Sequence, residues 1–357
     1  MAMDTLPLTA AAIGRFTGVK GEEVERYYKF HLSDFKTWVQ RGHAVDWVLL
    51  AKNLGKRCSI DETMLCGEVY TILSNKDGHG GRGSIIAIVK GTKAEVVSMI
   101  IKKMAEEERA RVTEITMDFS DSMYSIATAC FPNATIVIDC FHIVQRLCES
   151  LESMRLKFKR QAVVEDKKAA AAFAKEEERK AKRRAYYRKN HKKNPKEKRG
   201  RKRIRKRAYK PQVLPNGDTK VELLTRSRNL LAQSGEKWGE SKRERARLLF
   251  GLCPQMKEGH SIVCKLRGLF KQDITREEAK EKLHGWYKEV SRCTLREIKS
   301  ARDCIKRKEE EILNYFINRS TNASAESLNS KMKGFRAQLH GVADIPFFLY
   351  RVCTIFG

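Results

Sequence analysis

The spacing of apolar and polar residues changes period several times along the first 160 residues. Short β-branched and aromatic runs bounded by Gly, Asn and Asp are typical of strands, and amphipathic runs with helical spacing follow them. The expected strands are residues 58–62, 67–75, 84–91, 112–118 and 134–140, and the expected helices are residues 93–111, 122–131 and 141 to about 159. Three strands, a helix, a strand, a helix, a strand and a helix form the order of an RNase H-like α/β core. We therefore predict a mixed five-stranded sheet with helices.

Two shorter segments have more than one interpretation. The first 50 residues have a helical pattern, and IGRFTGVKGEEV (13–24) places small and apolar residues as a helix-turn-helix does. The second helix of that motif would begin with several glutamates, which repel phosphates. A small packing domain and a DNA-reading domain are therefore equally favoured interpretations. The glycine-rich KDGHGGRG (76–83) could cradle a phosphate. It lies between two expected strands with no helix after it, and this favours a plain hairpin.

The pattern after residue 150 is almost wholly helical. Prolines and a turn at 210–223 indicate an internal linker, and a last helix is expected to start near Asn322. The predicted organisation is a small helical region with a helix-turn-helix pattern (1–50), the first part of an RNase H-like core (51–150), a helical insertion (151–315) and the last part of the core with Glu326 (316–357).

The charge of the chain indicates a polyanionic partner. Lys and Arg number 72 against 44 Asp and Glu, a net charge of +28 over 357 residues. The basic block at 179–210 holds 19 Lys/Arg and one acid, so nucleic acid is the first expectation. Ten cysteines without a C-x-x-C pair and an N-terminus without an apolar signal core predict reduced thiols in a cytoplasmic protein. No run approaches the roughly 18 apolar residues of a membrane helix.

Three acids far apart in the sequence form the candidate site. Asp61 ends or interrupts the first expected strand, Asp118 ends the fourth, and Glu326 lies on the last expected helix. The first and fourth strands of an RNase H-like sheet are neighbours, so the three acids can converge. Carboxylates in one cleft repel each other unless a cation neutralises them, and hard oxygen ligands favour Mg²⁺ or Mn²⁺, as a pair of ions. Taken singly, each acid could instead cap a turn or the start of a helix.

Residues around these acids add to the pattern. Glu326, Asn329 and Lys333 share one helical face, which would present a metal ligand, an amide and a phosphate-binding cation together. We expect Asp121 to be an exposed cap at the start of a helix.

Four segments carry a resemblance to a known family. They are SIDETMLCGEVYTIL, TMDFSDSMYSIATACFPNATIVIDCFHIVQRL, LLTRSRNLL and SAESLNSKMKGFRAQLHG. Together they resemble the DDE transposases of the ISL-three group, especially its ISAon-like branch. The resemblance implies an RNase H-like core that cuts and joins the ends of an insertion sequence. It places the catalytic triad on Asp61, Asp118 and Glu326, and a downstream D-x-x-H element on Asp139 and His142.

The resemblance also bears on partners. Full-length members carry an N-terminal zinc-binding region, and this sequence has no Cys/His set with ligand spacing. In the ISAon-like branch that region is often encoded separately, so a partner polypeptide is expected to recognise the DNA ends. Bringing two element ends together makes a homodimer the expected state. The protein is expected in the cytoplasm, associated with the nucleoid, and its expected substrate is double-stranded DNA, both the element ends and the target.

Several residues have an open role. His142 could protonate a leaving group, but a supporting role beside the metals, with Asp139, is favoured. Trp238 and Trp286 could stack on flipped bases, but core positions are favoured. The basic block is expected to contact the DNA backbone rather than form a solvated arm. Its candidate residues are Arg183, Arg184, Arg199, Arg201, Lys202, Arg203, Arg205, Lys206 and Arg207.

Three functions remain to be distinguished. The predicted function is transposition by metal-dependent phosphodiester hydrolysis and strand transfer. The rivals are an RNase H-like nuclease or resolvase that cuts without joining, and an inactive, domesticated DNA-binding protein that keeps the fold.

Overall fold

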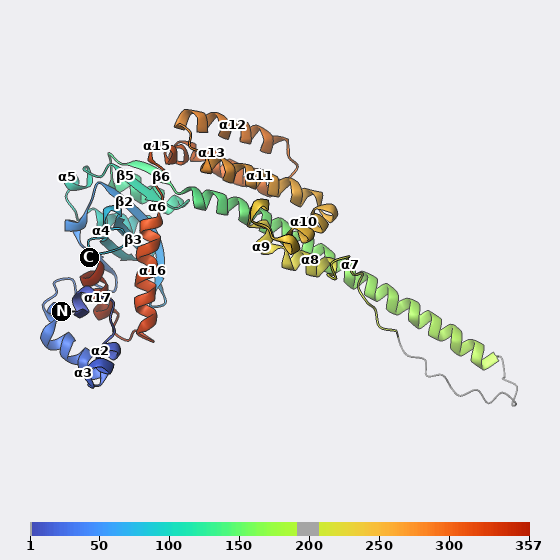
Figure 1. Cartoon of the computed structure of the whole chain (residues 1–357), viewed down its shortest axis with the longest axis horizontal. Helices are drawn as coiled ribbons and strands as arrows, with labels where there is room; N and C mark the ends of the chain where they lie inside the picture. The colour runs from blue at the N-terminus through green and yellow to red at the C-terminus, as the bar shows by residue number, and fades with distance from the viewer. Residues whose placement is uncertain (1, 191–206) are drawn as a thin grey trace. The chain divides into compact units, whose positions relative to one another are not determined.

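The computed structural model describes residues 2–190 and 207–357 (Figure 1). The chain forms two compact units. The first unit comprises Met1–Ile143, Gln272–Leu283 and Ile305–Gly357, and the second comprises Val144–Lys271 and His284–Cys304. The segments 272–283 and 305–315, which the sequence pattern assigned to the insertion, are therefore part of the first unit.

A mixed six-stranded sheet forms the centre of the first unit. Its strands are β1 (Trp47–Leu49), β2 (Arg57–Leu65), β3 (Glu68–Asn75), β4 (Ile85–Lys90), β5 (Glu114–Met117) and β6 (Thr135–Ile138). The spatial order is β1-β4-β3-β2-β5-β6, with β5 parallel to both β2 and β6 and the other pairs antiparallel. All five expected strands are present, and the 76–83 segment joins β3 to β4 as a hairpin. The structure is α/β, and its mixed sheet is compatible with the predicted RNase H-like fold.

The prediction of five strands was wrong by one, because β1 adds an edge strand beside β4. This strand has only three residues and lies in a segment whose pattern is otherwise helical, so its period-2 signal is too short to recognise. Val48 in its centre is fully buried. On its other side, the Gln40 side chain donates to the Leu49 carbonyl and accepts from the Leu49 N–H, at 2.8 and 2.7 Å. The side-chain amide thus satisfies part of an edge that the sheet leaves unpaired.

Helices surround the sheet in the first unit. They are α1 (Ala2–Thr5), α2 (Ala10–Thr17), α3 (Gly21–Tyr27), α4 (Ala94–Ile101), α5 (Glu106–Arg109), α6 (Asp121–Cys130), α14 (Glu309–Leu313), α15 (Tyr315–Asn318), α16 (Ala323–Gln338) and α17 (Ile345–Phe356). Short 3-10 or π turns are η1 (Tyr28–Leu32), η2 (Asp34–Lys36), η3 (Ala51–Asn53) and η4 (Lys76–Gly78). One hydrophobic core of the first unit joins β1, β3 and β4 to α16 and α17 through residues such as Ile72, Leu328, Phe335 and Val352.

Helices also build the second unit. It contains α8 (Lys220–Arg226), α9 (Arg228–Leu231), η5 (Gly235–Lys237), α10 (Glu240–Leu252) and α11 (Pro254–Lys271). Three helices, α7 (Cys140–Asn190), α12 (Arg276–Arg292) and α13 (Arg296–Arg307), begin in one unit and continue into the other.

The helical expectations hold in part. Residues 93–111 form two helices rather than one, because the chain turns after Lys102 and three glutamates then start α5, where negative charge is favoured. The helix from residue 140 continues to Asn190, well past Lys159. The helix at Asn322 is followed by α17, an apolar helix capped by Asp344 and buried along most of its length.

The N-terminal helices pair closely. Gly18 ends α2 in the left-handed region (φ 73°). A Cβ on Gly21 would lie 2.8 Å from the Ala11 Cα, so the two helices approach at a glycine. This helix pair shares a core with Phe347 and Tyr350 of α17.

Candidate active site

The register of β2 and β5 brings two of the three predicted acids side by side. Ile60 is paired with Met117 in the parallel ladder, and Asp61 and Asp118 are the next residues on the two strands. Asp61 lies inside β2 and is 9% exposed, whereas Asp118 follows the last residue of β5. The acids therefore lie where β5 ends and β2 continues in pairing with β3.

Asp118 is held by two side chains from distant elements. Its Oδ1 lies 2.9 Å from Nε2 of His142, in the first turn of α7, and accepts a 2.9 Å hydrogen bond from Nδ2 of Asn322. Burial alone would lower the pKa of His142. The hydrogen bond to Asp118 and the charges of Asp118, Asp139 and Asp61 outweigh burial and raise this pKa.

Asp61 accepts two hydrogen bonds but lies close to other negative charges. Its Oδ2 accepts from Nδ2 of Asn329 at 2.6 Å, and its Oδ1 accepts from the Glu62 N–H at 2.7 Å. Burial and the charge of Asp118 nevertheless raise the pKa of Asp61 to about 6, and the charge of Glu326 adds to this effect. The same causes, burial and then Asp118, raise the pKa of Glu62.

Glu326 occupies the first turn of α16, for which Asn322 is the N-cap residue. Its side chain is exposed, as is that of Lys333, while Asn329 on the same face is buried. Across residues 2–190 and 207–357, no three His, Cys, Asp or Glu side chains form a group that could hold a metal ion. Glu326 therefore acts on Asp61 through its charge, without completing a three-carboxylate ligand set.

Asp139 fixes backbone rather than side chains. One carboxylate oxygen accepts from the Phe141 N–H at 2.8 Å, at the start of α7, and the other accepts from the Asn322 N–H at 2.7 Å. It is 3% exposed. Asp139 thus ties the start of α7 to the start of α16.

The expected helix cap before α6 is a different residue. Ser120, not Asp121, accepts from the Met123 N–H and caps the helix, since it is the residue with extended backbone at that position. The Asp121 side chain is 96% exposed beside Lys308. Its predicted exposure agrees with the structure, and its predicted capping was wrong.

A family model described as a transposase, of the ISL3 group of DDE transposases, matches residues 58–210 and 199–352, which is most of the chain. The chain belongs to this transposase family. Neither the curated proteins nor the solved structures gave a match. Among the described residues of the transposase, no helix is both long and apolar enough to cross a membrane.

The sequence analysis missed one residue of the candidate site. Asn322 donates its backbone N–H to Asp139 and its side-chain amide to Asp118, and it is fully buried. The only signal was its place just before a predicted helix, which is also the ordinary position of a cap.

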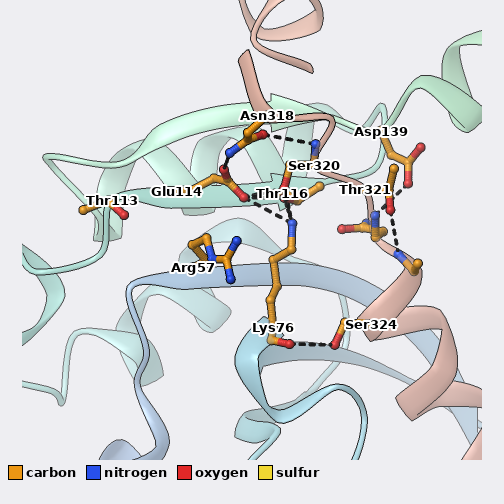
Figure 2. Close-up of polar contacts among 12 residues, drawn as sticks. Arg57, Lys76, Thr113, Glu114, Thr116, Asp139, Asn318, Ser320, Thr321 and Ser324 are labelled. Carbon is orange, nitrogen blue, oxygen red and sulfur yellow. Dashed lines mark hydrogen bonds and ion pairs between the residues drawn. The ribbon is translucent and has the colours of Figure 1, made fainter. Parts of the chain in front are cut away.

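Sequence reasoning also missed a polar cluster further along the same face of the sheet (Figure 2). Lys76 of η4 forms an ion pair with Glu114 of β5 at 3.1 Å, and both side chains are largely buried. A lone glutamate in an otherwise apolar strand was the available signal for this cluster.

The donor set of the candidate site fits a hard divalent cation. Asp61 and Asp118 offer carboxylate oxygens, and the buried Oδ1 atoms of Asn322 and Asn329 have no hydrogen-bond donor among the described residues. Buried acceptors without a donor are uncommon and require an explanation. Oxygen atoms of these types are the ligands that Mg²⁺ and Mn²⁺ prefer.

Trp286 is a core residue of the second unit, whereas Trp238 is only partly buried and lies against Phe250 and His260. The Trp286 indole N–H donates to the Ile262 carbonyl at 3.0 Å, and that of Trp238 donates to the Leu230 carbonyl at 3.1 Å. Trp286 is only 5% exposed.

The predicted DNA-contacting residues are only partly covered by the structure. Arg183 and Arg184 are exposed on α7, and Arg207 is also exposed. Arg199, Arg201, Lys202, Arg203, Arg205 and Lys206 lie outside the described residues.

Proposed function

We propose that the protein cleaves and joins DNA at the ends of an insertion sequence, with Asp61 and Asp118 as ligands of two Mg²⁺ or Mn²⁺ ions and with Glu326 completing the ligand set when metal and DNA bind. The observation that carries this proposal is the adjacency of Asp61 and Asp118 on parallel strands, with the charge of Glu326 acting on Asp61. Mutual repulsion among neighbouring acids is relieved by a cation. Membership of a transposase family supports the type of reaction.

Each neighbouring residue has a defined role in this proposal. A pair of bound ions would activate a water or a 3′-hydroxyl and stabilise the leaving oxygen of the phosphodiester. His142 and Asn322 orient Asp118, and Asn329 orients Asp61 through its 2.6 Å hydrogen bond. Lys333, which is exposed and on the same helical face as Glu326, would contact a DNA phosphate.

DNA is the proposed substrate in both steps. A water attacks the element end, and the freed 3′-hydroxyl then attacks target DNA in the same site. The basic block supplies phosphate contacts that neutralise the backbone without reading sequence. Two chains would hold two ends, as a homodimer, and a separately encoded protein would recognise the terminal sequence.

The test uses labelled duplex DNA carrying the element end, with Mg²⁺ or Mn²⁺, and measures cleavage and strand transfer separately. We expect Asp118→Asn and Glu326→Gln to lose both products. Asp121→Asn is the matched control, because it removes an exposed carboxylate three residues from Asp118. We expect this control to retain both products.

Other outcomes identify the rival functions. Cleavage without strand transfer, lost in the two variants, would identify a nuclease or resolvase. DNA binding without either product would identify an inactive DNA-binding protein. Equal activity of Asp118→Asn and the control would refute the triad.

A further inference from the structure

The glycine-rich turn between β3 and β4 does more than join two strands. Its first residue, Lys76, directs its ammonium group into the protein (Figure 2). The group contacts Glu114 Oε1 at 3.1 Å, Thr116 Oγ1 at 2.8 Å and the Ser320 hydroxyl. A lysine ammonium has three protons, and three acceptors surround this one.

These contacts fasten the segment that precedes α16. Asn318 and Ser320 both donate to the Glu114 carboxylate, and the Ser320 hydroxyl also lies 3.2 Å from that of Thr116. Two residues later, Asn322 binds Asp118 and Asp139. The segment 318–322 is thus attached to β5, and to the residues that follow β5 and β6, through Asn318, Ser320 and Asn322.

The same turn also touches α16 on both sides of Glu326. The Lys76 carbonyl accepts from the Ser324 hydroxyl at 3.3 Å, and the Gly80 carbonyl accepts from Lys331 Nζ at 2.8 Å. A Cβ on Gly80 would lie 3.0 Å from the Leu328 backbone nitrogen. Only a glycine allows this approach without moving the helix.

We propose that Lys76 and Gly80 are positioning residues, which hold segment 318–322 and the first turns of α16 so that Glu326 stands opposite Asp61 and Asp118. This inference rests on the proposed function of the three acids. Because Glu326 is exposed, its own side chain has little packing to fix it. Its place depends on the backbone of α16, and that backbone is held by the turn.

The opposite charges of Lys76 and Glu114 suit a positioning role. Burial alone would raise the pKa of Glu114, but hydrogen bonds from Ser320 and Asn318 and the ion pair with Lys76 lower it. A buried ion pair is weak evidence for stability, and its directional hydrogen bonds can instead specify one arrangement. The three acceptors of Lys76 belong to β5 and to segment 318–322, so they fix one against the other.

The first experiment separates positioning from stability. Lys76→Met leaves Glu114 buried without its cation, whereas Lys76→Met combined with Glu114→Gln removes both charges. We expect kcat for element-end cleavage to fall on the order of 10²-fold in both, with KM for DNA little changed, because small misplacements of catalytic groups have such effects. Lys90→Met is the control, since it removes a more exposed ion pair of the same sheet, to Glu68 at 3.0 Å. Recovery of kcat in the double variant, together with its stability, would overturn the inference.

A second pair of variants tests the glycine. Gly80 and Gly83 both have positive φ, of 69° and 80°, but a Cβ on Gly83 would meet nothing within 4 Å. Alanine therefore strains the backbone at either position and presses on α16 only at position 80. We expect Gly80→Ala to lower kcat about tenfold more than Gly83→Ala does. Equal losses in the two variants would count against a role for the turn in placing α16.

A third measurement does not depend on activity. Hydrogen exchange of the Asn322 amide, followed in the protein without metal or DNA, reports whether segment 318–322 opens locally. We expect exchange to be about tenfold faster in Lys76→Met and unchanged in Lys90→Met. Unchanged exchange in both would overturn the inference. If the parent protein neither cleaves nor joins DNA, the proposed function fails, and this measurement still decides whether the turn holds the segment.

Discussion

The two ends of β5 carry acids with opposite electrostatic environments. Glu114, Thr116 and Asp118 alternate along the strand, so their side chains lie on one face of the sheet. At one end, burial would raise the pKa of Glu114, but hydrogen bonds from Ser320 and Asn318 and the charge of Lys76 lower it. At the other end, Asp118 lies next to Asp61 of the neighbouring strand β2, and burial and the charge of Asp118 raise the pKa of Asp61 to about 6.

The difference lies in the partners that the protein supplies. Glu114 receives a full positive charge, as well as donors from Ser320 and Asn318. Asp61 receives two amide donors and faces two further acids. The charge of Glu114 is neutralised by a side chain of the protein, whereas the acids of the proposed active site are those that we propose bind a metal ion.

The largest effect is expected from removing one acid of the proposed active site. Asp61→Asn should reduce cleavage and joining by at least about 10⁴-fold, because a proposed metal ligand is lost. The same change should stabilise the metal-free protein by about 1 kcal/mol, since it removes one of several repelling charges. The Asn329 amide can reverse, since its Oδ1 has no partner among the described residues and can accept from the new amide. Urea unfolding in EDTA measures the stability, and a destabilised variant would contradict this account of the acids.

The next largest effect is expected from removing Glu114, the acid that Lys76 neutralises. Glu114→Leu leaves the Lys76 ammonium buried without its counter-charge and should lower the free energy of unfolding by about 3–5 kcal/mol. Adding Lys76→Met should restore part of that loss, because both charges are then gone. A double-mutant cycle by urea unfolding measures the coupling. Strictly additive losses would mean that the two side chains do not stabilise each other.

Local patterns predicted most of the sheet, because β2 to β6 are runs of apolar and β-branched residues between turn residues. The acids at the strand ends were visible for the same reason. Strand β1 was missed because three residues are too few for a period to appear, and its edge is completed by Gln40 from outside the strand. Helix α17 was missed because its nearly continuous apolar run lacks an amphipathic face.

The pairing of Lys76 with Glu114 and Ser320 could not be read from the sequence. These residues lie 38 and 244 positions from Lys76, and each alone is an ordinary polar residue.

The metal-binding role of Asp61, Asp118 and Glu326 remains a prediction. The sequence pattern and the family resemblance named those residues, but only the fold could show that Asn322 and Asn329 hold two of them.

A smaller effect is expected from replacing His142, which contacts Asp118. His142→Gln should lower kcat about 10- to 100-fold, as substitutions of residues that orient metal ligands do. The glutamine amide can still donate to Asp118 but lacks the raised pKa of His142, so the acidic limb of the pH–rate profile should also change. Steady-state cleavage across pH measures both. A pH–rate profile identical to that of the parent protein would show that the imidazole does not titrate in the reaction.

The smallest expected effect compares the two ends through pH. The pKa of Glu114 in the folded protein is below its ordinary value of 4.5, so the unfolded chain binds its proton more readily. The stabilisation from ionised Glu114 is therefore complete above about pH 4.5 and is lost as the pH falls through the lowered value. Glu114→Gln should be less stable than the parent protein by about 1–3 kcal/mol at pH 7. That difference should shrink in urea unfolding at pH 3 to 4, and a constant difference would assign the stabilisation to packing and hydrogen bonds rather than to charge.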